Sequence, residues 1–437
     1  MLRDTYIKDI TDDPSKEIKL GGWISRMKEL KTARFIWLSD RTGTVQVTLI
    51  KGNADPSLFE LFDSLNIHDF IVVRGSVPEK AVAKSNKEII PKQIQIIGKS
   101  EKPLPIDMSG TFESELETRL DWRPIALRNP KRMAVLKIES SIIEGFQKYL
   151  NSNDFVFIFT PSIIGVASEG GAEVFSIAYY DKKTYLRQDP QLHRQLLMLA
   201  GLDKIYEIGP SWRAELSHTT RHMTEHRTCA AELSFIESEQ DVMRVEEHMV
   251  EAALKNVIDK NSEDLEQLGV QAKVPKLPIP EFKFPEVYEI LESFGKKLQH
   301  GESVDHESEL LLAKYAEEKY HSEFYFLNRF PFASKPFYVM RFDEEPEYAR
   351  SFDLIYKGVE LSSGGQREHR YEKIIEQVKE KKMTLDSISW FTKFFRYGAP
   401  SHGGFSLGIE RITKQMLNME NIFEAAAFPR TAERVTP

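Results

Sequence analysis

"SWRAELSHTTRHMTEHRTCAAELSF", residues 211–235, places arginines, histidines and glutamates between two segments that end in apolar residues. Glu215 follows Arg213 by two residues, so both side chains would point to the same face of a strand. An Ala-Ala pair at positions 230 and 231 follows where further polarity would be expected. The stretch predicts a strand, a charged polar loop and a second strand.

The length and charge of the chain bound the kinds of protein it can be. Its 437 residues are too many for one hydrophobic core, so we expect two or three domains. A net charge of −8 argues against sequence-independent binding along duplex DNA. Residues 1–104, however, hold more Lys and Arg than Asp and Glu. A mildly basic N-terminal domain is compatible with local binding of a nucleic acid.

Cysteine usage and hydropathy predict a cytoplasmic protein without a membrane segment. Cys229 is the only cysteine, which excludes an internal disulfide and a cysteine-based zinc site and suits a reducing cytoplasm. No apolar run reaches the ~18 residues that a membrane span needs. The N-terminal residues lack the apolar region of a secretory signal.

Residues 1–102 have the pattern of a small β-barrel. Short segments rich in β-branched residues are separated by turn signals such as Arg-Thr-Gly, and one segment has helical spacing. Five or so strands and one helix are the inventory of an OB-type barrel, although a β-domain without a ligand remains an alternative. The expected strands are 18–29, 33–50 (two strands and a turn), 69–77 and 88–99, and the expected helix is 55–65.

Residues 103–130 lose periodicity and predict a hinge, and residues 131–437 predict a second, larger domain. Its helices do not alternate one-to-one with strands, which favours an antiparallel sheet flanked by helices over a doubly wound sheet. The fold class is therefore α+β, with a helical insertion around 262–325. The expected helices are 132–154, 190–202 and 240–260, and the expected strands include 155–164, 204–209, 337–343 and 348–365. The stretch 403–417 is expected to be a strand that runs into a helix.

Glycine patterns exclude the two commonest nucleotide-binding loops. The chain has no G-x-x-x-x-G-K-[ST] and no G-x-G-x-x-G that opens a helix. Three Gly-Gly pairs do lie beside charged residues, in "EGGAEVF" (169–175), "SSGGQREHR" (362–370) and "HGGFSLGIERI" (402–412). Such pairs let the backbone approach a ligand closely, although each alone is equally typical of a tight turn.

Three stretches taken together indicate a protein family far more specifically than the Gly-Gly pairs do. The strand–loop–strand at 211–235 resembles motif 2 of the class II aminoacyl-tRNA synthetases. "GGFSLGIERI" (403–412) resembles motif 3, and the helix at 132–150 running into a strand with Pro161 resembles motif 1, which builds the family's dimer interface. The resemblance implies a homodimer.

Further stretches resemble the aspartyl/asparaginyl branch of that class, in its compact archaeal form. The resemblance covers essentially the whole chain in order, and it implies an OB-type anticodon-binding domain followed by a class II catalytic domain. The stretches are "ETRLDWRPIALRNP", "ASEGGAEVF", "QDPQL", "FDLIYKGVELSSGGQREHR", "FRYGAPSHGGFSLGIERI" and "FPR".

The resemblance implies a site that activates an amino acid with ATP. Because the substrate carboxylate and the triphosphate are both anionic, the site must supply cations, and Arg213 and Arg411 match the catalytic arginines. No protein nucleophile is needed, because positioning and charge stabilisation carry the reaction. Mg²⁺ is the implied metal. The matching ATP-binding residues are Arg213, Glu215, Arg221, His222, His226, Glu360 and Arg411, and the matching metal-binding residues are Asp353, Glu360 and Ser363.

The amino-acid pocket both matches the family and departs from it. Matching or equivalent positions are Glu169, Gln188, Arg194, Ser363 and Arg367, of which Arg367 would pair with a side-chain carboxylate. In aspartyl enzymes, however, a lysine stands at the position of Arg194 and a serine stands at the position of Asp189. Ala230 replaces an aspartate that binds the substrate ammonium. Loss of such a carboxylate would cost on the order of several kcal/mol of pair energy. Asp189 would restore that charge from a new direction.

The resemblance also implies an anticodon site on the N-terminal domain. Phe35 resembles the residue on which a base stacks, and Gln46 resembles the residue that reads the central uridine. Arg26, Lys28, Lys31 and Arg34 form a basic run suited to phosphates, for which a solvated surface is the alternative.

The function implied first is aspartate–tRNA ligation with ATP and Mg²⁺, either specific for one tRNA or charging both Asp and Asn tRNAs. The altered pocket leaves open a related synthetase that activates another small carboxylated or β-amino acid. Asparagine specificity and a catalytically weak RNA-binding protein are further alternatives, and the presence of Arg213, Glu360 and Arg411 argues against the last.

Overall fold

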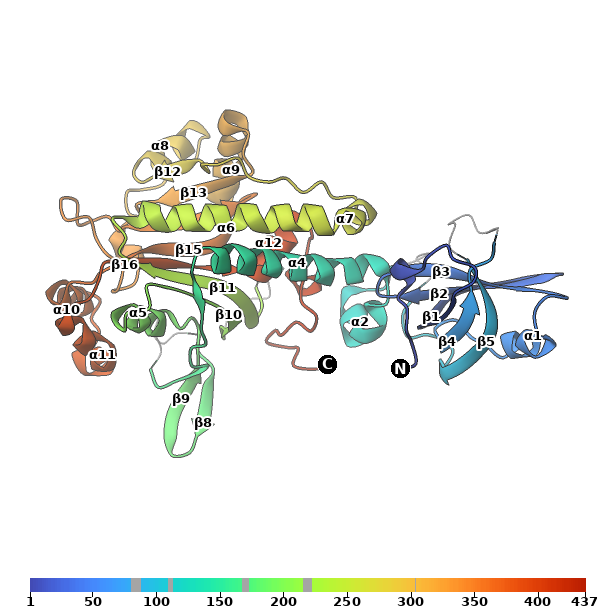
Figure 1. Ribbon diagram of the computed structural model, residues 1–437. Coiled ribbons are helices and arrows are strands. Elements are labelled where there is room, and N and C mark those ends of the chain that lie inside the picture. Colours follow the sequence, from blue (N-terminus) through green and yellow to red (C-terminus); the bar gives the residue numbers. More distant parts are fainter. Residues whose placement is uncertain (80–87, 109–112, 167–172, 215–221, 303) are drawn as a thin grey trace. The chain divides into compact units, whose positions relative to one another are not determined.

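The computed structural model of the chain describes residues 1–79, 88–108, 113–166, 173–214, 222–302 and 304–437. The chain divides into two compact units, Met1–Met133 and Ala134–Pro437 (Figure 1). Each unit has buried hydrophobic residues of its own, as expected of separate domains. Within the described ranges, no helix combines the length and the apolar character that a membrane crossing requires.

The first unit contains a closed five-stranded barrel with strand order β1-β2-β3-β5-β4. Alternation along the strands explains its core: in β2, Ile36 and Leu38 are buried, whereas Phe35 and Trp37 are only partly covered. The Asp55 side chain caps α1. The predicted OB-type barrel is confirmed. The elements are η1 (Ile7–Asp9), β1 (Glu17–Leu30), β2 (Ala33–Asp40), β3 (Gly43–Ile50), α1 (Pro56–Asp63), β4 (Phe70–Ser76) and β5 (Glu88–Gly98).

The stretch for which the sequence predicts a hinge contains two short helices, α2 (Leu116–Asp121) and α3 (Arg123–Ala126). Leu120 and Ala126 are buried. The loss of long-range periodicity at 103–130 therefore reflects helices too short to show an amphipathic repeat.

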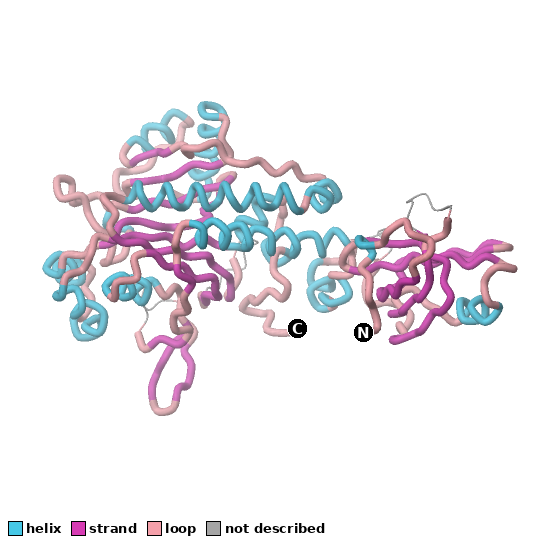
Figure 2. The backbone as a smooth tube through the Cα atoms, viewed as in Figure 1, coloured by secondary structure: helices cyan, strands magenta, loops and turns pink. Residues whose placement is uncertain are grey.

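The second unit is built on an eight-stranded sheet with strand order β12-β13-β14-β15-β16-β11-β10-β6. Figure 2 shows its strands in magenta and the helices around them in cyan. The inner strands pair antiparallel, whereas the edge strands β6 and β12 pair parallel. The α+β class is confirmed, with a mixed sheet. The strands are β6 (Val156–Phe157), β10 (Lys204–Trp212), β11 (Glu225–Ser234), β12 (Glu281–Lys283), β13 (Phe324–Asn328), β14 (Ser351–Tyr356), β15 (Val359–Arg367) and β16 (His402–Gly408).

Helices α4 (Pro130–Ser152) and α6 (Glu239–Lys260) lie side by side across one face of this sheet (Figure 1). Gly145 of α4 allows their close approach, because a Cβ there would lie 2.4 Å from the Ala253 Cα. Lys260 Nζ also bonds Glu144 at 2.6 Å. Helix α12 (Ile409–Met416) contributes to the same core.

Strand β11 shows how the two faces of the sheet differ. Cys229 and Ala231 are buried in the core under the helices. Because side chains alternate along a strand, Thr228, Ala230 and Glu232 point to the opposite face. That second face carries the candidate site.

Smaller elements complete the second unit around that face. A three-stranded sheet has the order β7-β9-β8, and residues of α5, α10, α11 and η3 contribute to a separate apolar cluster. The elements are β7 (Ile163–Ile164), β8 (Ser176–Tyr179), β9 (Lys182–Leu186), α5 (Gln191–Leu199), α10 (Tyr371–Glu380), α11 (Leu385–Thr392), η3 (Lys393–Tyr397) and η4 (Ile422–Glu424).

The segment 262–325 contains α7 (Ser262–Leu268), α8 (Glu286–Ser293) and α9 (His306–Tyr320). It also contributes β12 to the edge of the main sheet. Val287 and Leu312, from α8 and α9, pack with Leu327 of β13 in a cluster of their own. The segment is therefore part of the sheet's architecture as well as a helical addition.

The strand predicted at 337–343 is wrong. The chain there forms only isolated bridges, between Val339 and Arg367 and between Arg341 and Ala349, after a short helix η2 (Phe332–Ser334). Phe337 and Val339 pack against α10 and α11 residues in an apolar cluster. Consecutive residues from 337 to 340 are all buried, so the run is apolar because it is enclosed rather than because it alternates in a sheet.

Candidate active site

A cavity of about 630 Å³ lies over the second face of the sheet. Strands β10, β11, β14, β15 and β16 contribute to its lining, together with residues 334–339. Of the residues predicted for the site, the cavity brings together Gln188, Arg213, His222, His226, Asp353, Glu360, Ser363, Arg367 and Arg411. Glu169, Glu215 and Arg221 lie outside the described residues, and Arg194 is not among the lining residues.

The charged stretch that predicts two strands forms β10 and β11. Ser211 pairs with His226 across the two strands, and the backbone N–H of Arg213 donates to Thr224. Burial, followed by the neighbouring Arg213 and Arg411, lowers the pKa of His226 to about 3. The imidazole is therefore a flat, uncharged ring at neutral pH, near enough to Arg213 and Arg411 to feel their charge.

One end of the cavity gathers cations against carboxylates. Arg411 Nη1 donates to the Glu360 carbonyl oxygen at 2.9 Å and to its carboxylate at 3.2 Å. Lys335 Nζ lies 3.3 Å from both carboxylate oxygens of Asp353. Burial raises the pKa of Asp353, and Lys335 opposes that shift. The sequence reasoning missed Lys335, which precedes Pro336 in an apolar run and matches no charge pattern.

The carboxylates at this end of the cavity are of the kind that would hold a magnesium ion. Asp353 on β14 is paired in register with Ser363 on β15, and Glu360 also lies on β15. Within the described ranges, no cluster of three or more His, Cys, Asp or Glu side chains forms a complete metal cage. Mg²⁺ commonly takes one or two protein carboxylates and completes its shell with water and phosphate oxygens. Asp353 and Glu360 are such a pair.

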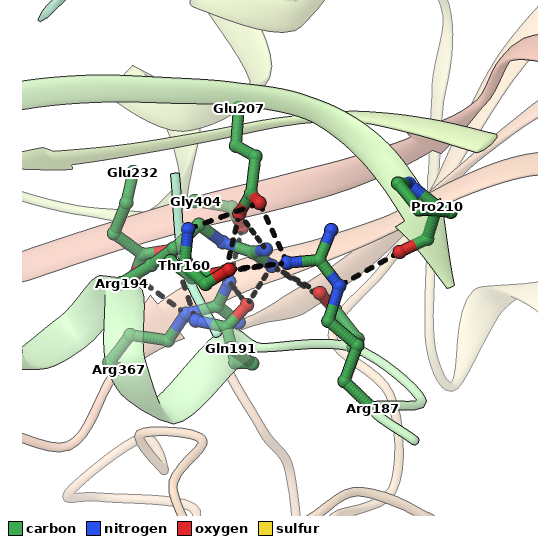
Figure 3. A network of polar contacts seen from close by, with 10 residues as sticks. Thr160, Arg187, Gln191, Arg194, Glu207, Pro210, Glu232, Arg367 and Gly404 are labelled. Atoms are coloured by element: carbon green, nitrogen blue, oxygen red, sulfur yellow. Dashed lines mark hydrogen bonds and ion pairs between the residues drawn. The ribbon is translucent and has the colours of Figure 1, made fainter. Parts of the chain in front are cut away.

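The other end of the cavity presents a fixed guanidinium group. Arg367 Nε donates to Glu232 at 3.0 Å, and Arg367 Nη2 donates to Gln191 at 3.0 Å and to the Gly404 carbonyl at 2.8 Å (Figure 3). Glu232 is fully buried. In the described part of the chain, Arg367 Nη1 has no hydrogen-bond partner. Arg367 is therefore held by two of its nitrogens and offers the third to a ligand.

Arg194 lies behind the cavity rather than in its wall. Its side chain is 1% exposed, and its Nη2 lies 2.7 Å from Asp189 Oδ1. The same nitrogen donates to Asp189 Oδ2 at 2.9 Å and to Gln191 Oε1 at 3.2 Å. Asp189 does line the cavity. The carboxylate therefore faces the ligand space, and the arginine supports it.

A second buried pair lies beside Arg194. Arg187 Nη1 donates to Glu207 Oε1 at 2.7 Å and to Thr160 Oγ1 at 2.8 Å (Figure 3). Glu207 Oε2 lies 4.0 Å from Arg194 Nη1. The sequence reasoning missed this pair, although a glutamate inside the apolar stretch "KIYEIG" is a signal for a buried charge that needs a partner.

The barrel of the first unit carries a separate candidate site on its outer surface. The rings of Phe35 and Trp37 lie 6.2 Å apart, and the Arg26 guanidinium lies 4.8 Å from the Trp37 ring centre. Gln46, which pairs with Trp37 across β2 and β3, donates from Nε2 to Glu88 at 3.3 Å. Thr48 also accepts from that amide nitrogen at 3.0 Å. The Gln46 carbonyl is thereby left to accept a hydrogen bond.

The basic run on this surface is not uniform. Arg34 Nη2 lies 2.6 Å from Glu29, and its guanidinium packs over Phe59 and Phe62 at 5.7 and 5.5 Å. Arg34 is therefore engaged within the unit, whereas Arg26, Lys28 and Lys31 are exposed.

Comparison with known families gives matches over both units. Residues 18–97 match the OB-fold nucleic acid binding domain, and residues 115–432 match the tRNA synthetases class II (D, K and N). The chain belongs to the class II tRNA synthetases. The resemblance inferred from the sequence motifs is confirmed.

Similar synthetases include aspartate ligases and asparaginyl enzymes. The chain is 44% identical to the aspartate–tRNA(Asp) ligase of Pyrococcus furiosus over 438 residues, covering 100% of both chains. It is 38% identical to the aspartate–tRNA(Asp/Asn) ligase of Aeropyrum pernix, again over 100% of both. The structure of asparaginyl-tRNA synthetase from Pyrococcus horikoshii with asparaginyl-adenylate matches with a TM-score of 0.92 at 28% identity, covering 100% of both chains.

Proposed function

We propose that this synthetase is an aspartate–tRNA ligase, which forms aspartyl-adenylate from ATP and transfers the aspartyl group to tRNA. Full-length identity of 43–44% to aspartate–tRNA ligases supports this function. The single structural observation that carries it is the Arg367 guanidinium, held by Glu232 and Gln191 with Nη1 left for a ligand. A guanidinium and a carboxylate form the strongest type of charge-assisted hydrogen bond.

The same observation bears on the alternatives. A guanidinium has donors only, so Arg367 Nη1 can donate to either oxygen of an aspartate side chain, whereas an asparagine amide has one acceptor oxygen and an NH₂ group that Arg367 cannot satisfy. The similarity to aspartate ligases over the whole chain favours aspartate over a different small carboxylated or β-amino acid. The altered residues Asp189, Arg194 and Ala230 then describe how this chain binds aspartate rather than a change of substrate.

Charge placement supports a reaction at the α-phosphate. In our assignment Arg213 and Arg411 lie on either side of the nucleotide, and the uncharged His226 ring stacks on the adenine. His222, Arg221 and Lys335 oppose the terminal phosphates, and Glu215 reads the adenine amino group. Such fixed charges stabilise negative charge that develops as the substrate carboxylate attacks the α-phosphorus.

Mg²⁺ is part of the proposal, and Asp353, Glu360 and Ser363 are the residues that would hold it. The ion would neutralise phosphate charge when bound. Lys335 pairs with Asp353 at 3.3 Å, so we infer that this lysine would be available to a phosphate group if a metal ion took its place beside Asp353.

Recognition of tRNA is assigned to residues 1–102, with 103–130 as the hinge and 131–437 as the catalytic domain. Phe35 offers a ring for base stacking, and the Gln46 carbonyl offers a hydrogen-bond acceptor, since Glu88 and Thr48 accept from its amide nitrogen. Because similar ligases charge either tRNA(Asp) alone or both tRNA(Asp) and tRNA(Asn), both tRNAs belong in the test. Aminoacylated tRNA is used by ribosomes, so we place the enzyme in the cytoplasm.

A second copy of the chain is the proposed partner of the β6 edge. Val156 and Phe157 on this edge strand are 47% and 39% exposed, and the adjacent Phe159 is 81% exposed. An unpaired edge strand with exposed apolar side chains favours association. A homodimer through this edge would cover them.

ATP–pyrophosphate exchange over a panel of amino acids tests the function, followed by charging of both tRNAs. We expect exchange with L-aspartate above all other amino acids, including L-asparagine and β-amino acids. Exchange that prefers another amino acid would refute the proposal.

A further inference from the structure

Asp189 occupies a distinctive place among the carboxylates of the cavity. The described lining includes Asp189, Asp353, Glu360 and Glu410. Asp353 faces Lys335, and Glu360 faces Arg411. Both oxygens of Glu410 accept from the Arg227 backbone N–H. Of these four carboxylates, Asp189 alone is linked by a chain of hydrogen bonds to Arg367, at the other end of the cavity.

The connection runs through two side chains. Arg194 Nη2 donates to Asp189 Oδ2 at 2.9 Å and to Gln191 Oε1 at 3.2 Å. Arg367 Nη2 donates to the same Gln191 oxygen at 3.0 Å. Gln191 therefore sets the spacing between an anionic group, Asp189, and a cationic group, Arg367. A short amino acid with a side-chain carboxylate carries the complementary charges, an ammonium and a carboxylate.

The sheet beneath offers no free carboxylate for that ammonium. Ala230 lies in register between Glu207 of β10 and Ser406 of β16, on the cavity side of β11. Ala230 is 1% exposed and carries no charge. Its neighbour Glu207 accepts from Arg187 at 2.7 Å and from Thr160 at 2.7 Å. A ligand ammonium approaching from the sheet would therefore meet a methyl group and a carboxylate that is already bound.

Arg194 is placed to support Asp189 without cancelling it. The guanidinium is shared, because Glu207 lies 4.0 Å from its Nη1 while Asp189 lies 2.7 Å from its Nη2. The Asp189 side chain is 17% exposed, whereas Arg194 is 1% exposed. The carboxylate thus remains accessible from the cavity with its orientation determined by a buried partner.

We propose that Asp189 binds the α-ammonium group of the substrate, that Arg194 is the positioning residue that holds it, and that Asp189 and Arg367 together select a short α-amino acid with a side-chain carboxylate. The inference rests on the proposed function and deepens it. The carboxylate reaches the ammonium from the segment before α5, rather than from the central strand of the sheet.

The test compares two ligands that differ in the ammonium group alone. L-aspartate is assayed as the substrate, and L-malate, with a hydroxyl in place of the ammonium, is assayed as a competitor of L-aspartate in exchange. In Asp189→Asn, we expect the KM for L-aspartate to rise about 10- to 100-fold. The inhibition constant of L-malate and the KM for ATP should change less than about threefold. Arg194→Lys should give an intermediate rise for L-aspartate only.

Glu207→Gln is the matched control, because it removes a buried carboxylate of the same network that does not line the cavity. Glu207→Gln should change the KM for L-aspartate and the inhibition constant of L-malate by the same factor. Should Asp189→Asn not fold, Asp189→Glu keeps the charge and the arginine's partner, and it should still weaken L-aspartate more than L-malate. An unchanged preference for L-aspartate over L-malate in a folded Asp189 variant would overturn the assignment. Wild-type enzyme without exchange on L-aspartate would instead refute the proposed function.

Discussion

Lys335 Nζ lies 3.3 Å from each carboxylate oxygen of Asp353, at the end of the cavity where Arg411 also lies. The lysine comes from the enclosed segment before β14, and the aspartate comes from the sheet. Two elements thus meet through a buried ion pair, and each member is also a proposed ligand-binding group.

Lys335→Ala should separate these two roles. Lys335 is the one cation paired with Asp353 among the described residues. Without the lysine, Mg²⁺ alone should therefore raise the melting temperature more than it does in the wild type. The KM for ATP should rise roughly tenfold, because one phosphate partner is lost. Thermal unfolding with and without Mg²⁺, alongside exchange kinetics, gives both quantities. Lys314→Ala, exposed on α9, is the control, and an equal Mg²⁺ effect in all proteins would contradict the prediction.

Arg213→Ala and Arg411→Ala should each lower ATP–pyrophosphate exchange by about 10²–10³-fold, because each removes a fixed donor from the reacting phosphate. Glu360→Ala should behave similarly and should also lose dependence on Mg²⁺. Arg244→Ala, whose side chain is 70% exposed on α6, should leave exchange unchanged. Near wild-type exchange in any of the first three variants would remove that residue from the mechanism.

Phe35→Ala and Gln46→Ala should weaken charging of tRNA while exchange stays at the wild-type level. Stacking is worth roughly 1–3 kcal/mol per base, or about 5- to 150-fold in affinity. The same purified variant supplies both readouts, so exchange serves as the control for folding. Equal charging by the variants and the wild type would mean that the barrel reads the anticodon elsewhere.

Phe159→Asp should shift the protein from dimer to monomer, since it places a charge in the apolar edge proposed as the contact. Sedimentation at micromolar concentration measures the change. Tyr180→Asp, at a side chain that is 91% exposed on the β8–β9 hairpin, is the matched control. A wild-type enzyme that is active as a monomer would exclude the dimer.

Glu246→Gln should flatten the dependence of stability on pH. Burial in the core, with a smaller contribution from the nearby Asp353 carboxylate, raises the pKa of Glu246 to about 8. The unfolded chain releases this proton near pH 4.5, whereas the folded chain keeps it up to about pH 8. The wild type should therefore lose stability, by up to a few kcal/mol, as the pH rises between these values. Urea unfolding of both proteins at pH 5 and pH 8 measures the difference, and Glu251→Gln, in a more accessible position on α6, is the control.

Local sequence patterns were enough to predict most of the fold. The short β-branched segments and the turn signals between them predicted the barrel, and the charged stretch at 211–235 predicted β10 and β11, because these signals depend on neighbouring residues. The segment at 337–343 could not be predicted in this way, since it is enclosed by α10 and α11 and its burial does not alternate. Its run of apolar residues predicts a strand, because the sequence alone does not show that helices cover it.

The residues of the candidate site also fall into those that local motifs predicted and those that they did not. Arg213, Glu360, Arg367 and Arg411 could be assigned from their motifs, and the cavity brings them together. Arg194 was expected at the ligand because a shorter lysine stands there in related enzymes. The position of the Arg194 side chain is set by the carboxylates of Asp189 and Glu207. Glu207 lies on β10, and the motif around Arg194 does not show that the two residues meet. Lys335 was missed for the same reason, because its partner Asp353 lies on another element.

The burial of Cys229 has a practical consequence for spectroscopy. The thiol is fully enclosed under the helices, and that burial raises its pKa, so it should not react with maleimide reagents in the native state. A cysteine introduced at exposed Lys31 on the barrel would then be the only reactive thiol. A fluorophore attached there would report tRNA docking in real time, and Cys229 would not have to be replaced first.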